Sequence, residues 1–418
     1  MSGMRILVDH SGYELLNIGD VSMLQVCVRR LRELWPTAEI AVITNDAELL
    51  AEYCPGTIPL DLWSGGPAVA QRVPARLRHI ATQLFKIAGP FAAVRRRTDD
   101  GAWPPPHDLL AAIRGADVVV ASGGGYMTDV WWWHGAGVLS VLRAAQRLGK
   151  PTAMFGQGVG PLEQRRMHWL LGAVGRRLDA FGLREGVLSP TLLAQVGVPP
   201  ERATVTGDDA LEIATPDVFT GAGSTIGLNI RVAGYTGTDG ARADAVRQVV
   251  LDAARELGAP VIAVPVSRYR KASEHGGASQ DLAATTAGSD IEQIEISTPQ
   301  ELAQTAQRCR VVVTSSYHAA VYGLAAGAAV VCLVGHDYYE AKFSGLCALF
   351  PTTATIVRLD REDALTELAA QVRRSWLVAD DQREQAWQAA RAQVARSREL
   401  YKAFQDKVEA RRTTMARR

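Results

Sequence analysis

Short apolar strands alternate with longer helical segments along almost the whole chain, and this alternation most constrains the fold. The segments 118–121 and 152–155 are apolar on both faces, as strands are when helices cover a parallel sheet on both sides. Regular alternation of strand and helix with short turns is typical of doubly wound α/β domains. The sequence therefore predicts an α/β protein built from parallel sheets.

The alternation runs twice, so we expect two Rossmann-like domains that face a cleft. At roughly 100–200 residues per domain, a chain of 418 residues also favours two domains. Strands are predicted at 5–8, 39–43, 117–121, 151–155 and 180–183, and again at 225–230, 261–264, 293–296, 310–313 and 330–333. Helices are predicted at 20–34, 138–148, 163–177, 242–257, 299–307 and 319–326. The predicted boundaries are an N-terminal domain at 1–212, a linker at 213–224, a C-terminal domain at 225–360 and a helical tail at 361–418.

The composition argues against several kinds of function. A net charge of +1 gives no support to a nucleic-acid partner, which usually needs a strong basic excess. The five cysteines contain no CxxC pair, which predicts a reducing compartment without disulfides or structural zinc. The N-terminus lacks the pattern of a signal peptide, and no apolar run reaches the ~18 residues of a membrane span. We expect a cytoplasmic protein that needs no metal.

Residues 64–106 fit the alternation poorly. Between 70 and 97, basic side chains are interleaved with apolar ones. Such a stretch can lie on an anionic membrane or hold an acidic acceptor, and this predicts a peripheral membrane contact through 70–97. The alternative is a solvated helix followed by a loop that ends in the prolines at 104–106.

Two motifs of the first domain follow strands. Asn17 and Asp20 lie where the first helix begins, where they can cap free N–H groups or mark an anion site. A segment of three glycines after strand 117–121 leaves room for a ligand at the carboxyl edge of the sheet, although it could also form a tight turn: Gly123, Gly124 and Gly125. The glycines do not form the GxGxxG pattern, so a nicotinamide cofactor is not expected.

Three further residues of this domain are candidates for the cleft. Trp132 belongs to a run of three tryptophans, which either stack on a sugar or pack in the core. Gln157 lies in a glycine-rich segment at 156–161, predicted as a loop after a strand. Arg184 ends the strand at 180–183, where its planar fork suits a carboxylate or phosphate. The alternative for Arg184 is an ion pair with Glu185 or Asp208.

The second domain carries the residues that suit an anionic donor. A segment with two serines and a histidine joins strand 310–313 to an alanine-rich helix: Ser315, Ser316, Tyr317 and His318. Hydroxyl groups and helix N–H groups can together hold an anion, and His318 could move a proton near neutral pH. Arg231 and Lys342 follow other strands and are candidate anion contacts, with surface solvation as the alternative for Lys342.

In this order, the motifs resemble those of the polysaccharide pyruvyl transferase family. The likeness covers about residues 6–350 and depends on the ordered set, because no single motif is decisive. The motifs are NIGD at 17–20, SGGG at 122–125, GQGVGP at 156–161, LRE..LS at 183–189, GDDAL at 207–211, SYHAAVYGLAAG at 316–327 and YYEAKFSGL at 338–346.

The resemblance implies a GT-B-like fold and a transferase that uses phosphoenolpyruvate as co-substrate and no other cofactor. Family members attach pyruvate as a ketal to sugar hydroxyls of a glycan or lipid-linked precursor. The family's Arg of R-[DE]-x-x-x-S corresponds to Arg184, and its His of R-L-H corresponds to His318. Ser316 replaces the Arg of that second motif. We expect Arg231, Arg268 or Lys342 to supply the missing positive charge; the alternative is that the donor or the reaction has changed.

These expectations divide the candidate residues by role. His318 and Arg184 are predicted to be catalytic. The donor is predicted to contact Arg231, Ser315, Ser316, Tyr317 and Lys342, with the backbone amides near Ser315 and Ser316 holding phosphate. The acceptor is predicted to lie against Asn17, Asp20, Gly123, Gly124, Gly125, Trp132 and Gln157 in the N-terminal domain.

Two other functions remain open at this point. A nucleotide-sugar glycosyltransferase on the same fold would hold a nucleotide diphosphate between the domains. A non-catalytic member of the family would bind a glycan or a partner without chemistry, and the loss of the arginine at position 316 favours this alternative.

Overall fold

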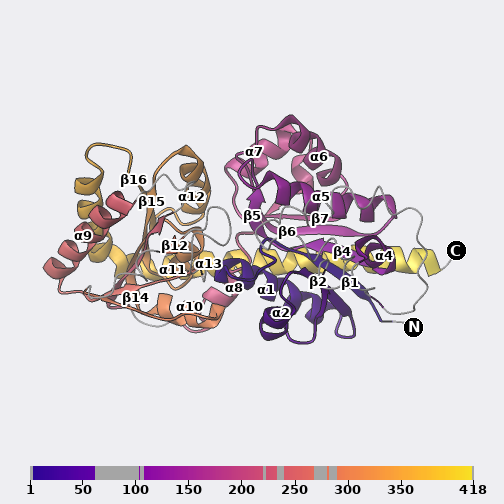
Figure 1. Cartoon of the computed structure of the whole chain (residues 1–418), viewed down its shortest axis with the longest axis horizontal. Coiled ribbons are helices and arrows are strands. Elements are labelled where there is room, and N and C mark those ends of the chain that lie inside the picture. The colour runs from indigo at the N-terminus through magenta and orange to yellow at the C-terminus, as the bar shows by residue number, and fades with distance from the viewer. Residues whose placement is uncertain are drawn as a thin grey trace, which may run out of the picture.

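The protein folds into two α/β lobes that a long C-terminal helix connects (Figure 1). The computed structural model describes residues 3–61, 103, 108–219, 223–232, 240–267, 280–281 and 290–416. In both main sheets every strand pair is parallel, which confirms the predicted fold class. No helix among these residues is long and apolar enough to cross a membrane.

The first lobe contains a sheet of eight parallel strands. Its order is β3-β2-β1-β4-β6-β7-β8, and β5 pairs with β6. The strands are β1 (Arg5–Asp9), β2 (Glu39–Thr44), β3 (Ile58–Asp61), β4 (Val118–Ala121), β5 (Gly124–Met127), β6 (Thr152–Val159), β7 (Ala180–Leu183) and β8 (Thr204–Val205). The helices are α1 (Ile18–Leu34), α2 (Ala47–Tyr53), α4 (Leu109–Gly115), α5 (Trp132–Arg147), α6 (Arg165–Gly175), α7 (Leu188–Gln195) and α8 (Leu211–Ala214).

The second lobe contains a sheet of six parallel strands in the order β13-β11-β9-β14-β15-β16, the strand order of a Rossmann domain. The strands are β9 (Thr225–Asn229), β11 (Val261–Ala263), β13 (Ile291–Glu292), β14 (Cys309–Thr314), β15 (Ala329–Val334) and β16 (Ala354–Arg358). A separate antiparallel pair joins β10 (Arg231–Val232) to β12 (Gln280–Asp281). The helices are α9 (Gly240–Leu257), α10 (Pro299–Gln307), α11 (Tyr317–Ala325) and α12 (Asp337–Leu349).

Three predicted elements differ from the observed ones. The strand expected to end at residue 155 continues to Val159, because Gly156 adopts φ +57° at a register shift and lets the strand bend without ending. The strand expected at 293–296 is wrong, since β13 covers only Ile291–Glu292, which pair with Val261 and Ile262 of β11. Helix α5 begins at Trp132, six residues before the predicted start.

Helices cover both faces of each sheet, as the apolar strands predict. In β1, Leu7 points into a core that includes α5 and α6, whereas Ile6 and Val8 point into a core that includes α1. In β14, Val312 packs toward α11, whereas Val311 and Val313 pack toward α9. Each strand therefore buries both of its faces.

The C-terminal helix α13 (Ala364–Ala416) packs against both lobes (Figure 1). In the first lobe the Tyr401 ring stacks on Phe155 with centroids 3.6 Å apart, and the Tyr401 hydroxyl donates to Asp209 at 3.0 Å. The same carboxylate pairs with Arg30 at 3.0 Å, and both side chains are buried. In the second lobe Arg310 of β14 pairs with Asp380 of α13 at 2.7 Å. One helix thus fixes the lobes relative to each other.

Each sheet has a point where the strand order reverses, between β1 and β4 and between β9 and β14. Ligands of open α/β sheets bind at such points, outside the carboxyl ends of the strands. The glycine segment 122–125 follows β4, and the segment 315–318 follows β14. The fold therefore brings both predicted motifs to ligand-binding edges.

Candidate active site

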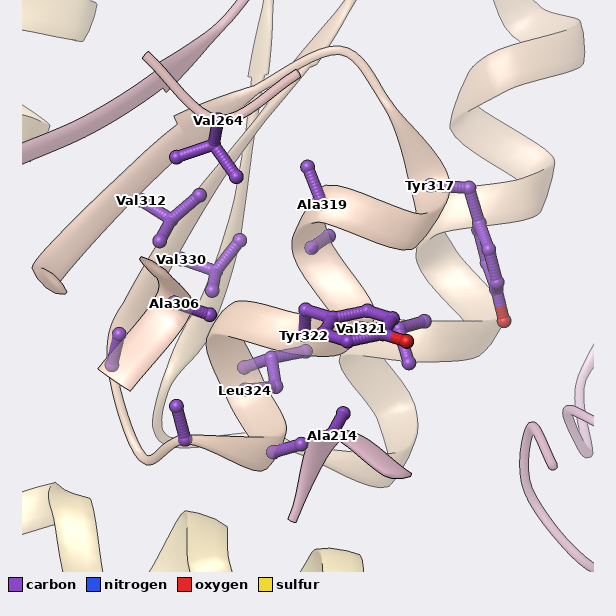
Figure 2. Packing of buried hydrophobic residues seen from close by; sticks show 14 of the residues in the cluster. Ala214, Val264, Ala306, Val312, Tyr317, Ala319, Val321, Tyr322, Leu324 and Val330 are labelled. Carbon is purple, nitrogen blue, oxygen red and sulfur yellow. The ribbon is translucent and has the colours of Figure 1, made fainter. Parts of the chain in front are cut away.

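The start of α11 is held by hydrogen bonds on one side and apolar packing on the other. The Ser315 amide donates to Asn229 O at 3.1 Å, and the Ser316 amide donates to Thr314 Oγ1 at 2.8 Å. Figure 2 shows the body of the helix, from Ala319 to Leu324, among the buried side chains of the second lobe. The N-terminus of α11 is therefore fixed in place at the end of β14.

These bonds limit which amides near Ser315 and Ser316 can bind a ligand. The amides of Ser315 and Ser316 cannot hold a phosphate, because Asn229 and Thr314 already accept their hydrogen bonds. The Ser315 hydroxyl is also engaged, since it accepts the Arg231 amide at 2.7 Å. Ser316 is the N-cap residue of α11, but its side chain makes no capping hydrogen bond. The amides left to a ligand are those of the first turn of the helix, which begins at Tyr317.

His318 faces a carboxylate from the other lobe. Its Nε2 atom lies 3.8 Å from Oδ2 of Asp208, and the two side chains are 9% and 1% exposed. Neither atom has a hydrogen-bond partner among the residues that the structure describes. The other carboxylate oxygen of Asp208 accepts the Ala210 amide at 2.9 Å, which orients the group. Two buried polar atoms without partners therefore face each other across the lobe boundary.

The first turn of α1 packs directly on the imidazole. A Cβ atom at Gly19 would lie 2.0 Å from Cγ of His318, so only glycine fits at this position. Asn17 caps the helix by accepting the Gly19 amide at 3.0 Å, and the Ile18 amide donates to Val266 O of the second lobe at 2.9 Å. The NIGD motif is thus a helix cap whose glycine admits His318.

Two cations converge on Gly125 from opposite lobes. A Cβ atom there would lie 2.9 Å from Nη2 of Arg184 and 3.3 Å from Nζ of Lys342. The Arg184 guanidinium also stacks on the Tyr317 ring, with Cζ 4.0 Å from the centroid. Arg184 therefore lies next to the residue that precedes His318, and the predicted catalytic pair shares one site.

Burial shifts the pKa values of Asp208 and His318 in opposite directions. Burial lowers the pKa of His318 well below its usual value, and the positive charges of Arg184, Arg231 and Lys342 lower it further. Burial raises the pKa of Asp208 to about 7, although the charge of Arg184 opposes this rise. Before a ligand binds, the proton of the pair therefore resides on Asp208 near neutral pH.

Asp20 completes the charged cluster from the first turn of α1. Burial raises the pKa of its carboxyl, and a hydrogen bond from Ser11 and the charges of Arg231, Arg184 and Lys342 partly offset this effect. These three basic residues act on both Asp20 and His318, so the residues from both lobes form one electrostatic unit.

Other polar atoms around the cluster are also unsatisfied. Gln157 donates from Nε2 to Gly124 O at 2.7 Å, while its Oε1 atom has no partner among the described residues. The same holds for the hydroxyl groups of Ser122, Ser316 and Tyr317. Buried polar groups without partners are uncommon in folded proteins, and several at one lobe boundary indicate that a polar ligand binds there.

Some residues predicted to contact the acceptor pack within the first lobe. Trp132 is partly buried against the core of the first lobe, and it stacks on Trp133 with centroids 3.6 Å apart. A Cβ at Gly123 would clash with Gly156 O, and one at Gly124 would clash with the Tyr126 ring. These two glycines allow close packing, whereas Gly125 leaves space between the cations. The segment 70–97 and Arg268 lie outside the described residues.

Sequence reasoning missed Asp208 as a site residue. It treated Glu185 and Asp208 alike, as partners for Arg184, whereas the Glu185 carboxylate accepts the amides of Val187, Leu188 and Ser189 and caps α7. The available signal was position, because Asp208 follows β8 at the same sheet edge as Arg184. Its neighbour Asp209 points the other way, toward Arg30 and α13.

A cavity of about 460 Å³ lies elsewhere, between α1, the end of α2 and α10. Its lining includes Gln25, Arg29, Tyr53 and Gln300, and none of the residues of the charged cluster. Among the residues described, no group of three or more His, Cys, Asp or Glu side chains could hold a metal ion. The charged cluster at the lobe boundary, and not this cavity, combines unsatisfied polar atoms with titratable groups.

Two doubly wound lobes with a charged site between them define a protein with a GT-B-type α/β fold. The polysaccharide pyruvyl transferase family model matches residues 17–337, so the chain belongs to this family. A comparison with curated proteins gave no match.

Solved structures share the fold at low sequence identity. A putative UDP-N-acetylglucosamine 2-epimerase from Listeria monocytogenes is similar with a TM-score of 0.61 at 12% identity, covering 98% of each chain. A UDP-GlcNAc 2-epimerase from Neisseria meningitidis bound to UDP-GlcNAc gives 0.53 at 11% identity, covering 97% of this chain and 99% of that one. The glycotransferase of kitacinnamycin gives 0.54 at 13% identity, covering 95% and 97%. These likenesses establish the GT-B fold.

Proposed function

We propose that this protein transfers pyruvate from phosphoenolpyruvate onto two hydroxyl groups of a sugar and forms a cyclic ketal. The observation that carries the proposal is the convergence of Arg184, Arg231 and Lys342 on one buried imidazole, whose Nε2 atom faces the Asp208 carboxyl. Membership of the polysaccharide pyruvyl transferase family supports the same reaction.

The three basic side chains match the charge of the donor. Phosphoenolpyruvate carries one carboxylate and a phosphate, about −3 in total near neutral pH. Arg184, with its planar fork, suits the carboxylate, while Lys342 and the first-turn amides of α11 suit the phosphate. Arg231 and Lys342 would then supply the positive charge that Ser316 lacks where other family members have arginine.

The Asp208–His318 pair supplies the proton that the reaction requires. The methylene carbon of the enol accepts this proton, and the first sugar hydroxyl forms a bond to the adjacent carbon and loses its own proton. The bond from that carbon to the phosphate oxygen breaks, phosphate leaves, and the second hydroxyl closes the ring. One hydroxyl proton restores the pair and the other leaves with phosphate, so atoms and charges balance.

Donor binding would switch the pair to its reactive state. The three cations lower the pKa of His318, and a bound trianion would offset their charge and raise that pKa. A proton held on Asp208 could then reach His318 when the donor is present. Asp20, whose pKa is raised by burial, is placed to accept a proton from a sugar hydroxyl.

The proposal is tested with the purified full chain, phosphoenolpyruvate and a set of glycans that carry neighbouring free hydroxyl pairs. We expect phosphoenolpyruvate to raise the thermal unfolding temperature, phosphate to be released, and the product to gain one pyruvate less one water by mass spectrometry. Stabilisation by UDP but not by phosphoenolpyruvate, without phosphate release, would instead support a nucleotide-sugar glycosyltransferase. Binding of a glycan without turnover would support a non-catalytic member of the family.

Replacing Asp208 with asparagine is expected to change the pH profile. In the native protein the reactive form carries a proton on the pair, so kcat/KM should fall about tenfold per pH unit above a pKa of about 7. Asp208→Asn should lower kcat/KM by about 100-fold or more at pH 6 and remove this alkaline limb of the pH profile.

The matched control is Asp209→Asn, one residue further along. Asp209 bonds to Arg30, Ser397 and Tyr401, so this variant should lower the thermal stability. It should keep the limb but move it to a lower pH, because the charge of Asp209 raises the pKa of Asp208. An unchanged limb in Asp208→Asn would show that Asp208 has no part in the proton transfer.

A further inference from the structure

The outer helices of the first lobe carry positive charge without any negative charge. Neither 132–150 nor 165–178 contains Asp or Glu, although the chain as a whole has a net charge of only +1. The basic residues are Arg143, Arg147, Lys150, Arg165, Arg166, Arg176 and Arg177. The charges of the chain are therefore distributed unevenly, with a basic excess on α5, α6 and the turns that follow them.

These residues form one surface. Helices α5 and α6 lie side by side on the face of the sheet opposite α1 (Figure 1). The Arg143 guanidinium of α5 lies 4.3 Å from the Trp169 ring centroid of α6, so the outer faces of the two helices are continuous. Arg147, Arg165 and Arg166 are exposed on the same two helices. We call this surface, with Trp133 and Trp169, the α5–α6 face.

Two observations show that this face suits a charged, partly apolar partner. Burial lowers the pKa of Arg143, and the charges of Arg147 and Arg177 lower it further. The positive charges of these three arginines therefore repel one another. Trp169 is 61% exposed and Trp133 is 37% exposed, which is costly for large aromatic side chains in water. Binding a negatively charged surface would relieve the repulsion and cover the indole rings.

We propose that the α5–α6 face docks the protein on the surface of an anionic lipid bilayer. Arginine side chains would contact lipid phosphates, and the indole rings would lie at the headgroup level, where Trp is enriched. A membrane fits better than a nucleic acid, because the charges are spread over the outer surface of two helices and accompany exposed tryptophans. The inference is independent of the proposed reaction, since it concerns a different surface.

The test is co-sedimentation of the full chain with vesicles. We expect binding to vesicles that contain phosphatidylglycerol, little binding to phosphatidylcholine alone, and loss of binding at high salt. The triple variant R143Q/R147Q/R166Q should weaken binding on the order of 100-fold, at about fivefold per arginine near the surface. Trp169→Ala should weaken the binding that persists at moderate salt.

The matched control is R361Q/R374Q/R396Q, which removes the same charge from exposed arginines in the C-terminal part of the chain. It should bind vesicles as the native chain does. Because the basic segment 70–97 could also bind lipid, binding by the native chain alone does not test the α5–α6 face. The test depends on the loss of binding in R143Q/R147Q/R166Q. Equal loss in both triple variants, or full binding by R143Q/R147Q/R166Q, would overturn the proposal. Equally tight binding of a soluble sulfated polysaccharide, unaffected by Trp169→Ala, would assign the face to an acidic glycan.

Discussion

His318→Ala is expected to abolish phosphate release while phosphoenolpyruvate still binds. The imidazole is buried between Gly19 and Asp208, with its Nε2 atom 3.8 Å from Oδ2 of Asp208. General acid–base groups contribute roughly 100- to 10,000-fold, so kcat should fall by at least about 100-fold. Binding should persist because Arg184, Arg231 and Lys342 are intact. Single-turnover phosphate release and calorimetric titration with phosphoenolpyruvate measure the two effects separately.

His168→Ala is a suitable control for this variant. His168 lies on α6, where its Nε2 atom bonds to Leu162 O at 2.6 Å, away from the charged cluster. We expect near-native turnover from this control and native-like thermal unfolding from both variants. Full turnover by His318→Ala would remove the histidine from the mechanism, and loss of donor binding would instead assign it to the donor site.

Arg184→Ala is expected to lower kcat/KM for phosphoenolpyruvate and to shift the pH profile to higher pH. A charge-assisted contact contributes about 1.5–3 kcal/mol, so kcat/KM for phosphoenolpyruvate should fall by roughly 10–150-fold. The guanidinium charge lowers the pKa of both Asp208 and His318, and its removal raises both pKa values. The limb in kcat/KM should therefore shift above pH 7, although the overall rate is lower.

Two further variants separate the charge from the shape of this side chain. Arg184→Lys keeps the charge, so the limb should stay near its native position while the loss of the planar fork still lowers affinity. Arg202→Ala removes an exposed arginine of the same lobe and should change neither quantity. A normal KM together with an unshifted limb in Arg184→Ala would contradict the proposed donor site.

The fold could be predicted from the sequence because its strands bury both faces. Segments such as 118–121 contain no polar position, and this pattern leaves few arrangements other than a sheet between helix layers. Where the pattern misled, as at 293–296, the paired strand is Ile291–Glu292 instead, and a single sequence does not reveal which residues of an edge strand pair with its neighbour.

The site could be predicted in part, because parallel strands bring their carboxyl ends to one edge. Arg184 and His318 were identified on that basis, and the structure places Arg184 against Tyr317, next to His318. The role of Asp208 was not visible, because it depends on burial against a residue from the other lobe. The sequence also could not show that the amides of Ser315 and Ser316 themselves are engaged, because their acceptors, Asn229 and Thr314, are selected by the folded strands.

The path of α13 has a consequence for the order of assembly during synthesis. Tyr401, Phe404 and Val408 lie in the same hydrophobic core as Ile6 and Val8 of the first strand. The layers of the first lobe therefore remain incomplete while the second lobe is being translated. This lobe can reach its native packing only after the residues up to 408 have emerged, so the earliest part of the chain to be made is among the last to finish folding.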